Sequence, residues 1–281
     1  MSIALGLFAA VAFGACDFFA GLASRWMHPA VVAVSSQSMA LITAIVAVLI
    51  FPGDGPTAHA VIWGALGGVA SGSGALALYH GLSVGRMSVV ATLSGLMTAV
   101  IPVLFGLAAG DTLSIASAVG IVLAIPAIGL VSWHPGAGEG HGQAGALWGF
   151  VAGIGFGLLF IALDQAGTES GAWPLVGNQG SSVLVALPVA LFAFRRGSVV
   201  VTRHGVYLTA VAGVLIGLAS LAFLAATHSG ELAIVVVLTA LYPGFTAILA
   251  RIFLAERWIR TQQVGLVAAL IAVILVSAGS A

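Results

Sequence analysis

GRMSVVATLSGLMTAVIPVLFGLAAGD (85–111) and GELAIVVVLTALYPGFTAILARIFLAE (230–256) are two stretches of this sequence that match when the second is shifted back by 145 residues (230 − 85). The aligned pairs include small, polar and acidic residues: Gly85 with Gly230, Ser94 with Thr239, and Asp111 with Glu256. Apolar residues match easily by chance, whereas a sustained register that includes glycines and acids does not. We therefore infer an internal repeat.

Composition places the repeated unit in a membrane. Of the 281 residues, 61% are hydrophobic and only 6% are charged, and the mean hydropathy is +1.21. A soluble domain carries about a quarter charged residues, so most of this surface does not face water. The 38 glycines suit membrane helices, which use small residues to bring backbones close together. The net charge of zero gives no reason to expect a nucleic-acid partner.

Apolar segments long enough to cross a bilayer recur along the whole chain. About 20 apolar residues are needed to span the hydrocarbon region, and short breaks rich in Gly, Pro and charged residues separate such runs. The runs are continuous rather than alternating, which favours helices over membrane strands. The predicted spans are 3–23, 30–51, 60–80, 88–109, 113–132, 144–165, 173–194, 205–226, 232–254 and 262–279.

These spans predict an all-α integral membrane protein with ten transmembrane helices in two halves. The expected units are a first repeat (1–133), a Gly-rich linker (134–143) and a second repeat (144–281). Five helices per repeat is an odd number, so the two halves must lie in opposite orientations. Inverted repeats are typical of secondary transporters, whose sites lie near the bilayer midplane at the repeat interface.

The segment LTALYPGFTAILARIFLAERWIRTQQVGLVAALIAVILVS (238–277) resembles the end of the second EamA repeat in the drug/metabolite transporter superfamily. That pattern has a Pro-containing helix, a Glu-Arg tail and a Gln-x-x-Gly start to the last helix. The first half is similar through GACDFFAGLASR (14–25) and ALYHGLSVGRMSVV (77–90), although Asp111 replaces the usual Glu and Thr98 stands where the second half has Pro243.

The resemblance covers essentially the whole chain and implies a function. It implies a multi-pass protein of the bacterial inner membrane, made of two inverted five-helix EamA-like repeats, that exports amino acids, metabolites or drugs. It does not select a substrate among these.

Asp17 is the most informative candidate residue. It lies well inside the first predicted helix, where a carboxylate costs about 2.5–3.5 kcal/mol. Gly14 and Gly21, three and four residues away, form a small-residue face suited to helix contact. Desolvation disfavours the charged carboxylate, so a proton-coupling or substrate-cation site is one interpretation. An acid hydrogen-bonded to a neighbouring helix is the other.

A polar cluster, Ser35-Ser36-Gln37-Ser38, overlays Asn178-Gln179-Gly180-Ser181 at an offset of 143 residues (178 − 35). Polar side chains at equivalent depth in inverted halves face each other across the pseudo-two-fold axis, and such groups need partners in a dry interior. For the serines, hydrogen bonding between helices is sufficient. Gln37, Asn178 and Gln179 are candidates for the solute pathway.

Five further residues complete the candidate substrate or coupling site. Trp and Tyr side chains could line the cavity or anchor helices at the interface, and the two charged residues could be solvated at helix ends or reach the surface. These candidates are Tyr79, Trp148, Tyr242, Asp164 and Arg251. Asp111 and Glu256 end predicted helices, where a turn or cap role explains them.

The arginines bear on orientation. The chain has eight, and seven lie in odd-numbered loops: Arg25, Arg86, Arg195, Arg196, Arg203, Arg257 and Arg260. The positive-inside rule would make those loops cytoplasmic and place both termini outside, whereas proteins that resemble this one usually have cytoplasmic termini. An even helix count requires only that the termini share a side.

The leading hypothesis is a secondary transporter, with no enzyme activity and no cofactor, that moves a small-molecule solute through the lipid bilayer by alternating access. Protons are a candidate coupling ion, and a monomer and a homodimer both remain open. A flippase for a lipid-linked intermediate is the alternative, and a lateral opening lined with basic residues would favour it. An intramembrane enzyme would need a convergent set of acids or His ligands, and the sequence offers only isolated candidates. The chain's lone cysteine, Cys16, excludes an intrachain disulfide.

Overall fold

The computed structural model describes residues 2–108, 114–132, 141–167, 169–197, 199–229, 239, 241–256 and 258–279. Every regular element in this part of the chain is a helix. The helices are α1 (Ser2–Ala23), α2 (Pro29–Ile50), α3 (Ala58–Val84), α4 (Met87–Ala108), α5 (Ile115–Ser132), α6 (His141–Gln165), α7 (Trp173–Arg195), α8 (Arg203–Ser229), α10 (Tyr242–Phe253) and α11 (Arg260–Gly279).

The helices confirm the all-α prediction, and each predicted span overlaps one of them. Within the described residues, α1, α2, α3, α6, α7 and α8 are long and apolar enough to cross a membrane. Shorter apolar helices lie within α4, α5 and α11. The ninth predicted span is covered by α10 only from Tyr242, because 230–238 lies outside the described residues. The count of ten spans therefore stays a prediction.

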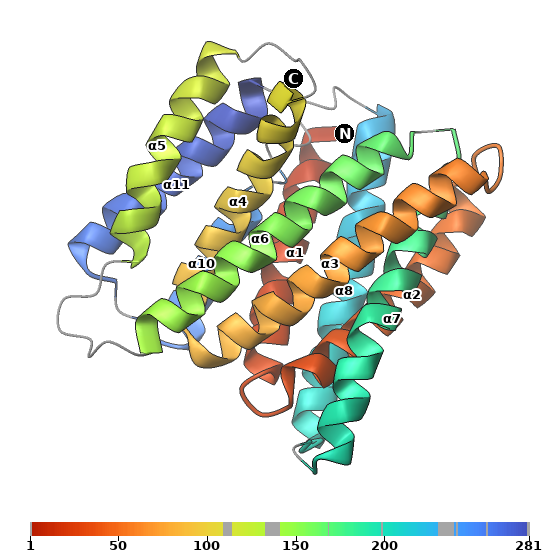
Figure 1. Cartoon of the computed structure of the whole chain (residues 1–281), viewed down its shortest axis with the longest axis horizontal. Coiled ribbons are helices and arrows are strands. Elements are labelled where there is room, and N and C mark those ends of the chain that lie inside the picture. The colour runs from red at the N-terminus through yellow and green to blue at the C-terminus, as the bar shows by residue number, and fades with distance from the viewer. Residues whose placement is uncertain are drawn as a thin grey trace.

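Three helix pairs and four flanking helices make up the bundle (Figure 1). The pairs are α5 with α11, α4 with α10, and α2 with α7. Around them, α1 packs against α8 and α10, while α6 packs against α3 and α4. In the predicted repeat, α1 corresponds to α6, α8 to α3, and α10 to α4. The contacts of α1 with α8 and α10 therefore correspond to those of α6 with α3 and α4.

Close packing at two glycines follows the same correspondence. A Cβ atom added to Gly14 in α1 would lie 2.6 Å from Phe245 Cβ and 2.7 Å from the Tyr242 carbonyl oxygen, both in α10. A Cβ atom added to Gly157 in α6 would lie 2.6 Å from Ile101 Cβ in α4. Each helix therefore approaches its neighbour at a position where only glycine leaves room.

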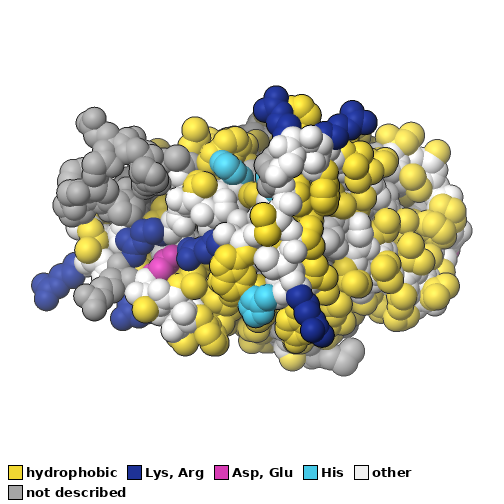
Figure 2. Space-filling model, turned by 90° about the horizontal axis from the view of Figure 1, so that it is seen from below, with side chains coloured by type: hydrophobic (Ala, Val, Ile, Leu, Met, Phe, Trp, Pro, Cys, Tyr) yellow, Lys and Arg dark blue, Asp and Glu magenta, His cyan; other side chains and the backbone are white. Residues whose placement is uncertain are grey.

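The two ends of the bundle differ in charge. The described residues of loops 24–28, 85–86, 196–202 and 254–259 lie at one end, which we call the arginine end. Figure 2 shows this end, with several arginine side chains and one acidic side chain. The described arginines near this end are Arg25, Arg86, Arg195, Arg196, Arg203, Arg251 and Arg260. The N- and C-terminal helix ends lie at the opposite end (Figure 1).

Candidate functional site

Asp17 lies inside α1 and is only 8% exposed. The Cys16 thiol donates a weak hydrogen bond to Asp17 Oδ1 at 3.6 Å and another to the Phe13 carbonyl oxygen at 3.0 Å. Among the described residues, no arginine or histidine forms an ion pair with this carboxyl group. A buried acid without a cationic partner is costly in a membrane, so Asp17 stays the leading candidate for a functional position.

Two tyrosines lie near Asp17, and the sequence predicted both as candidates. Tyr79 in α3 is buried and Tyr242 at the start of α10 is half-buried. Both phenol groups lie within electrostatic range of the Asp17 carboxyl group. The Phe13 ring meets the Tyr242 ring edge-on, with 6.4 Å between centroids. Three predicted site residues from three helices therefore come together.

Hydroxyl groups extend this polar region to α2 and α4. The Tyr79 side chain faces Ser36 of α2, and the Tyr242 side chain faces Ser94 and Thr98 of α4. Sequence reasoning missed Ser94 and Thr98 as site residues. The repeat alignment held a signal for one of them, because it pairs Ser94 with another hydroxyl residue, Thr239.

The two glutamines lie in the paired helices α2 and α7 and are both buried, at 6% exposure for Gln37 and 7% for Gln179. The Oε1 atom of each has no hydrogen-bond partner in the described part of the chain. Leaving a buried polar group unpaired costs about 1–3 kcal/mol. Each of these atoms could therefore accept a hydrogen bond from a ligand or a water molecule.

Two glycine contacts indicate that the repeat alignment around these glutamines should be shifted by one residue. Gly68 of α3 packs on the Asn178 carbonyl group, and Gly213 of α8 packs on the Ser36 carbonyl group. Because Gly68 and Gly213 are 145 residues apart, Ser36 corresponds to Asn178, at an offset of 142 rather than 143. The glutamine at 37 then corresponds to the one at 179.

Three hydroxyl groups share the unpaired state of the glutamines. Ser94, Ser182 and Thr239 are each at most 4% exposed, and their oxygen atoms have no hydrogen-bond partner among the described residues. Ser94 and Thr239 also correspond to each other under the repeat. Two sets of unpaired polar atoms, Gln37 with Gln179 and Ser94 with Thr239, therefore lie at positions that the predicted repeat aligns.

Asn178 differs from its neighbour Gln179. Its Oδ1 atom accepts a hydrogen bond of 2.7 Å from the Ser71 hydroxyl group in α3, and both side chains are buried. This bond joins α3 to α7 and satisfies the carbonyl end of the amide.

Trp148 and Arg251 are not among the described residues grouped around Asp17. Trp148 in α6 is 37% exposed, and its ring meets that of His80 at 4.9 Å, edge to face. Arg251 in the last turn of α10 is exposed, with its guanidinium carbon 4.8 Å from the centre of the Trp258 ring. The side chain of Asp164 lies outside the described part of the structure.

Glu256 caps the start of α4 rather than the helix that it follows. Its carboxylate accepts hydrogen bonds from the backbone N–H groups of Met87 (2.8 Å) and Ser88 (3.3 Å), at the start of α4. The Ser88 hydroxyl donates a third, at 2.6 Å. Its repeat counterpart, Asp111, lies outside the described residues.

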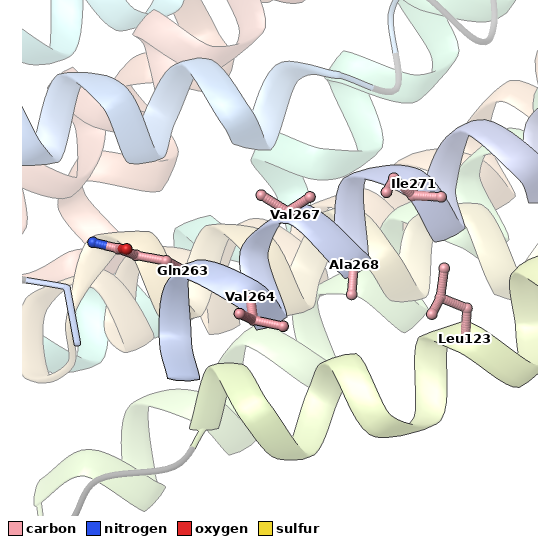
Figure 3. Close-up of a pocket in the computed structure, with 6 residues that line it drawn as sticks. All are labelled: Leu123, Gln263, Val264, Val267, Ala268 and Ile271. Atoms are coloured by element: carbon pink, nitrogen blue, oxygen red, sulfur yellow. The ribbon is translucent and has the colours of Figure 1, made fainter. Parts of the chain in front are cut away.

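A groove between α5 and α11 lies apart from this polar region (Figure 3). It is lined by Leu123, Gln263, Val264, Val267, Ala268 and Ile271. None of these is a predicted site residue. In the described residues, no three His, Cys, Asp or Glu side chains are grouped so that they could hold a metal ion.

Comparison with known proteins finds a family similarity in the second half of the chain. Residues 143–278 match the sequence profile of the EamA-like transporter family. The matched segment corresponds to the predicted second repeat. Together with the apolar helices, it is consistent with an EamA-domain, transporter-like membrane protein. A search of curated proteins finds no match.

A solved structure, described as a crystal structure of a protein, shares the fold of this chain. The similarity has a TM-score of 0.64 and covers 98% of this chain and 95% of the other, at 13% sequence identity. At this identity the comparison shows the fold alone, but it does so over nearly the whole length.

Proposed function

We propose that this protein is a secondary transporter that exports a small organic solute by alternating access between two inverted halves. The solute would pass where α1, α2, α3, α4, α7 and α10 bring their buried polar groups together. Corresponding helix contacts, the glycine pair 14 and 157, and the paired unsatisfied polar atoms all support two related halves.

The observation that carries this proposal is the buried carboxyl group of Asp17, which lies near Tyr79 and Tyr242. It is 8% exposed and has no ion-pair partner among the described residues. Such a group can hold a proton in one state and a cationic or hydrogen-bonding solute in another. Asp17 is therefore the proposed coupling residue.

The charges of this region limit the class of solute. The described arginines lie at a helix end or in loops, so an organic anion would find no cation beside Asp17, and burying an unpaired anion is costly. The unpaired oxygens of Gln37 and Gln179 accept hydrogen bonds. We therefore expect a neutral, zwitterionic or cationic solute that donates hydrogen bonds. A lipid-linked anion, as a flippase would carry, fits less well.

The test is thermal stabilisation of the purified protein across a panel of metabolites, because a ligand that binds the native state raises the unfolding temperature. A stabilising solute should then be transported by proteoliposomes. We expect Asp17→Asn to reduce its transport by at least about tenfold and to remove the dependence on pH. Transport by Asp17→Asn at the wild-type rate, with unchanged pH dependence, would exclude Asp17 as the coupling residue.

A further inference from the structure

The carboxylate of Glu256 joins the two halves at the arginine end. Glu256 follows α10 in the second half, whereas its three hydrogen-bond donors, from Met87 and Ser88, begin α4 in the first half. The first N–H groups of a helix lack partners within it and carry a partial positive charge. The contact is therefore charge-assisted and holds the start of α4 in place.

A second contact at the same end crosses between the halves. Arg86 Nη1 donates a hydrogen bond of 2.8 Å to Gln262 Oε1 at the start of α11. The same oxygen accepts a weaker bond from the Ile259 N–H group at 3.4 Å. Gln262 is only 2% exposed. The two contacts join residues 86–88, at the start of α4, to Glu256 and to the start of α11.

The side chain of Met87 extends from this contact into the bundle, toward α1. Met87 is fully buried, and a Cβ atom added to Gly21 of α1 would lie 3.1 Å from Met87 Cε and 2.9 Å from Leu82 Cδ1. Gly21 is one helical turn beyond Asp17, toward the arginine end. Met87, whose backbone N–H donates to Glu256, thus packs against α1 between the level of Asp17 and the arginine end.

We propose that Glu256, Ser88 and Met87 form a gate at the arginine end, closed in this structure and opened when Glu256 leaves the start of α4. Release of the carboxylate would free α4 to move and would withdraw the Met87 side chain from α1. This inference rests on the proposed alternating access and adds the contact that controls it.

The native Cys16 offers a reporter that requires no known substrate. It is the chain's lone cysteine, its thiol lies 3.6 Å from Asp17 Oδ1, and it is 3% exposed. A thiol reacts when water and reagent reach it. A membrane-impermeant methanethiosulfonate reagent, applied to oriented membrane vesicles from one side at a time, therefore measures opening at each end.

The experiment compares full-length wild type, Glu256→Gln and Ser88→Ala, with Glu169→Gln as the matched control. Glu169 is an exposed acid in the loop at 166–172, at the opposite end, so this variant makes the same charge change away from the gate. We expect Glu256→Gln to speed Cys16 modification from the arginine end about tenfold or more, because hydrogen bonds to charged groups are strong. Ser88→Ala, which loses one bond, should give a smaller increase, and Glu169→Gln none.

Several outcomes would overturn the gate. One is an unchanged rate in both gate variants, and another is an equal rise from both sides, which indicates general loosening. If Glu256→Gln does not fold, Ser88→Ala alone decides, because it keeps the carboxylate and two of the three bonds. If wild-type Cys16 is modified slowly and the rate is the same in the gate variants, the proposed gate is wrong but the proposed transport function still stands. Modification in none of the proteins would contradict both.

Discussion

At the scale of single residues, the Asp17 carboxyl group is buried without a cationic partner among the described residues. We expect Asp17→Asn to unfold at or above the wild-type temperature, because an amide is easier to bury than an acid. A structural ion pair would behave oppositely, since its loss costs about 3–5 kcal/mol. Thermal unfolding in detergent measures the difference. A large loss of stability in Asp17→Asn would show that the acid serves packing.

The neighbouring amides of α7 give a second prediction. Asn178→Leu should lower the free energy of unfolding by about 1–3 kcal/mol, because the buried Ser71 hydroxyl loses its acceptor. Gln179→Leu should lower it by less, because the Oε1 atom of Gln179 has no partner in the described residues. When unfolding is measured with a stabilising solute present, Gln179→Leu should no longer be stabilised by that solute. Equal destabilisation by the two variants would contradict the assignment of Gln179 to the pathway.

Some candidate site residues could be predicted from the sequence and others could not. Asp17 was predictable because a carboxylate inside an apolar run has few explanations. Ser94 and Thr98 were not, because a serine or threonine in a helix can bond to a carbonyl one turn back, as Thr98 does to Ser94 at 2.8 Å. Trp148 and Arg251 lie away from Asp17 because position along a helix does not determine which neighbour a side chain faces.

At the scale of helices, the third prediction concerns Gly14, where α1 lies close to α10. Gly14→Ala should destabilise the protein by about 1–3 kcal/mol, because its Cβ would overlap α10 and force the helices apart. Gly180→Ala in α7 is the control, since its Cβ would meet no described atom within 4 Å. That change should raise the free energy of unfolding by up to about 1 kcal/mol through helix propensity. The prediction fails if Gly14→Ala is as stable as Gly180→Ala.

The helices were the most predictable level of the fold, because long apolar runs between Gly- and Pro-rich breaks leave a membrane chain few alternatives. Their neighbours were not predictable from hydropathy. The pairing of α5 with α11 and of α2 with α7 depends on side-chain packing between distant segments. The internal repeat supplied the correspondence between halves, but contacts at Gly68 and Gly213 were needed to correct its register by one residue.

At the scale of the whole molecule, the charge distribution predicts orientation. The described arginines gather near one end (Figure 2), and the chain termini lie at the other (Figure 1). By the positive-inside rule the arginine end faces the cytoplasm. An alkaline phosphatase fused to the C-terminus should therefore be active outside the cytoplasm, and the same enzyme inserted in the loop at 196–202 should be inactive. The reverse pattern would place the arginine end outside.

In the proposed transport cycle, the region around Asp17 is exposed to water at one end of the bundle and then at the other. Modification of wild-type Cys16 by a membrane-impermeant thiol reagent, applied to each membrane face separately, tests this cycle. We expect slow modification from both faces, with the rate from one face falling when a bound solute favours opening to the other. Modification from one face only, under all conditions, would contradict alternating access at this site.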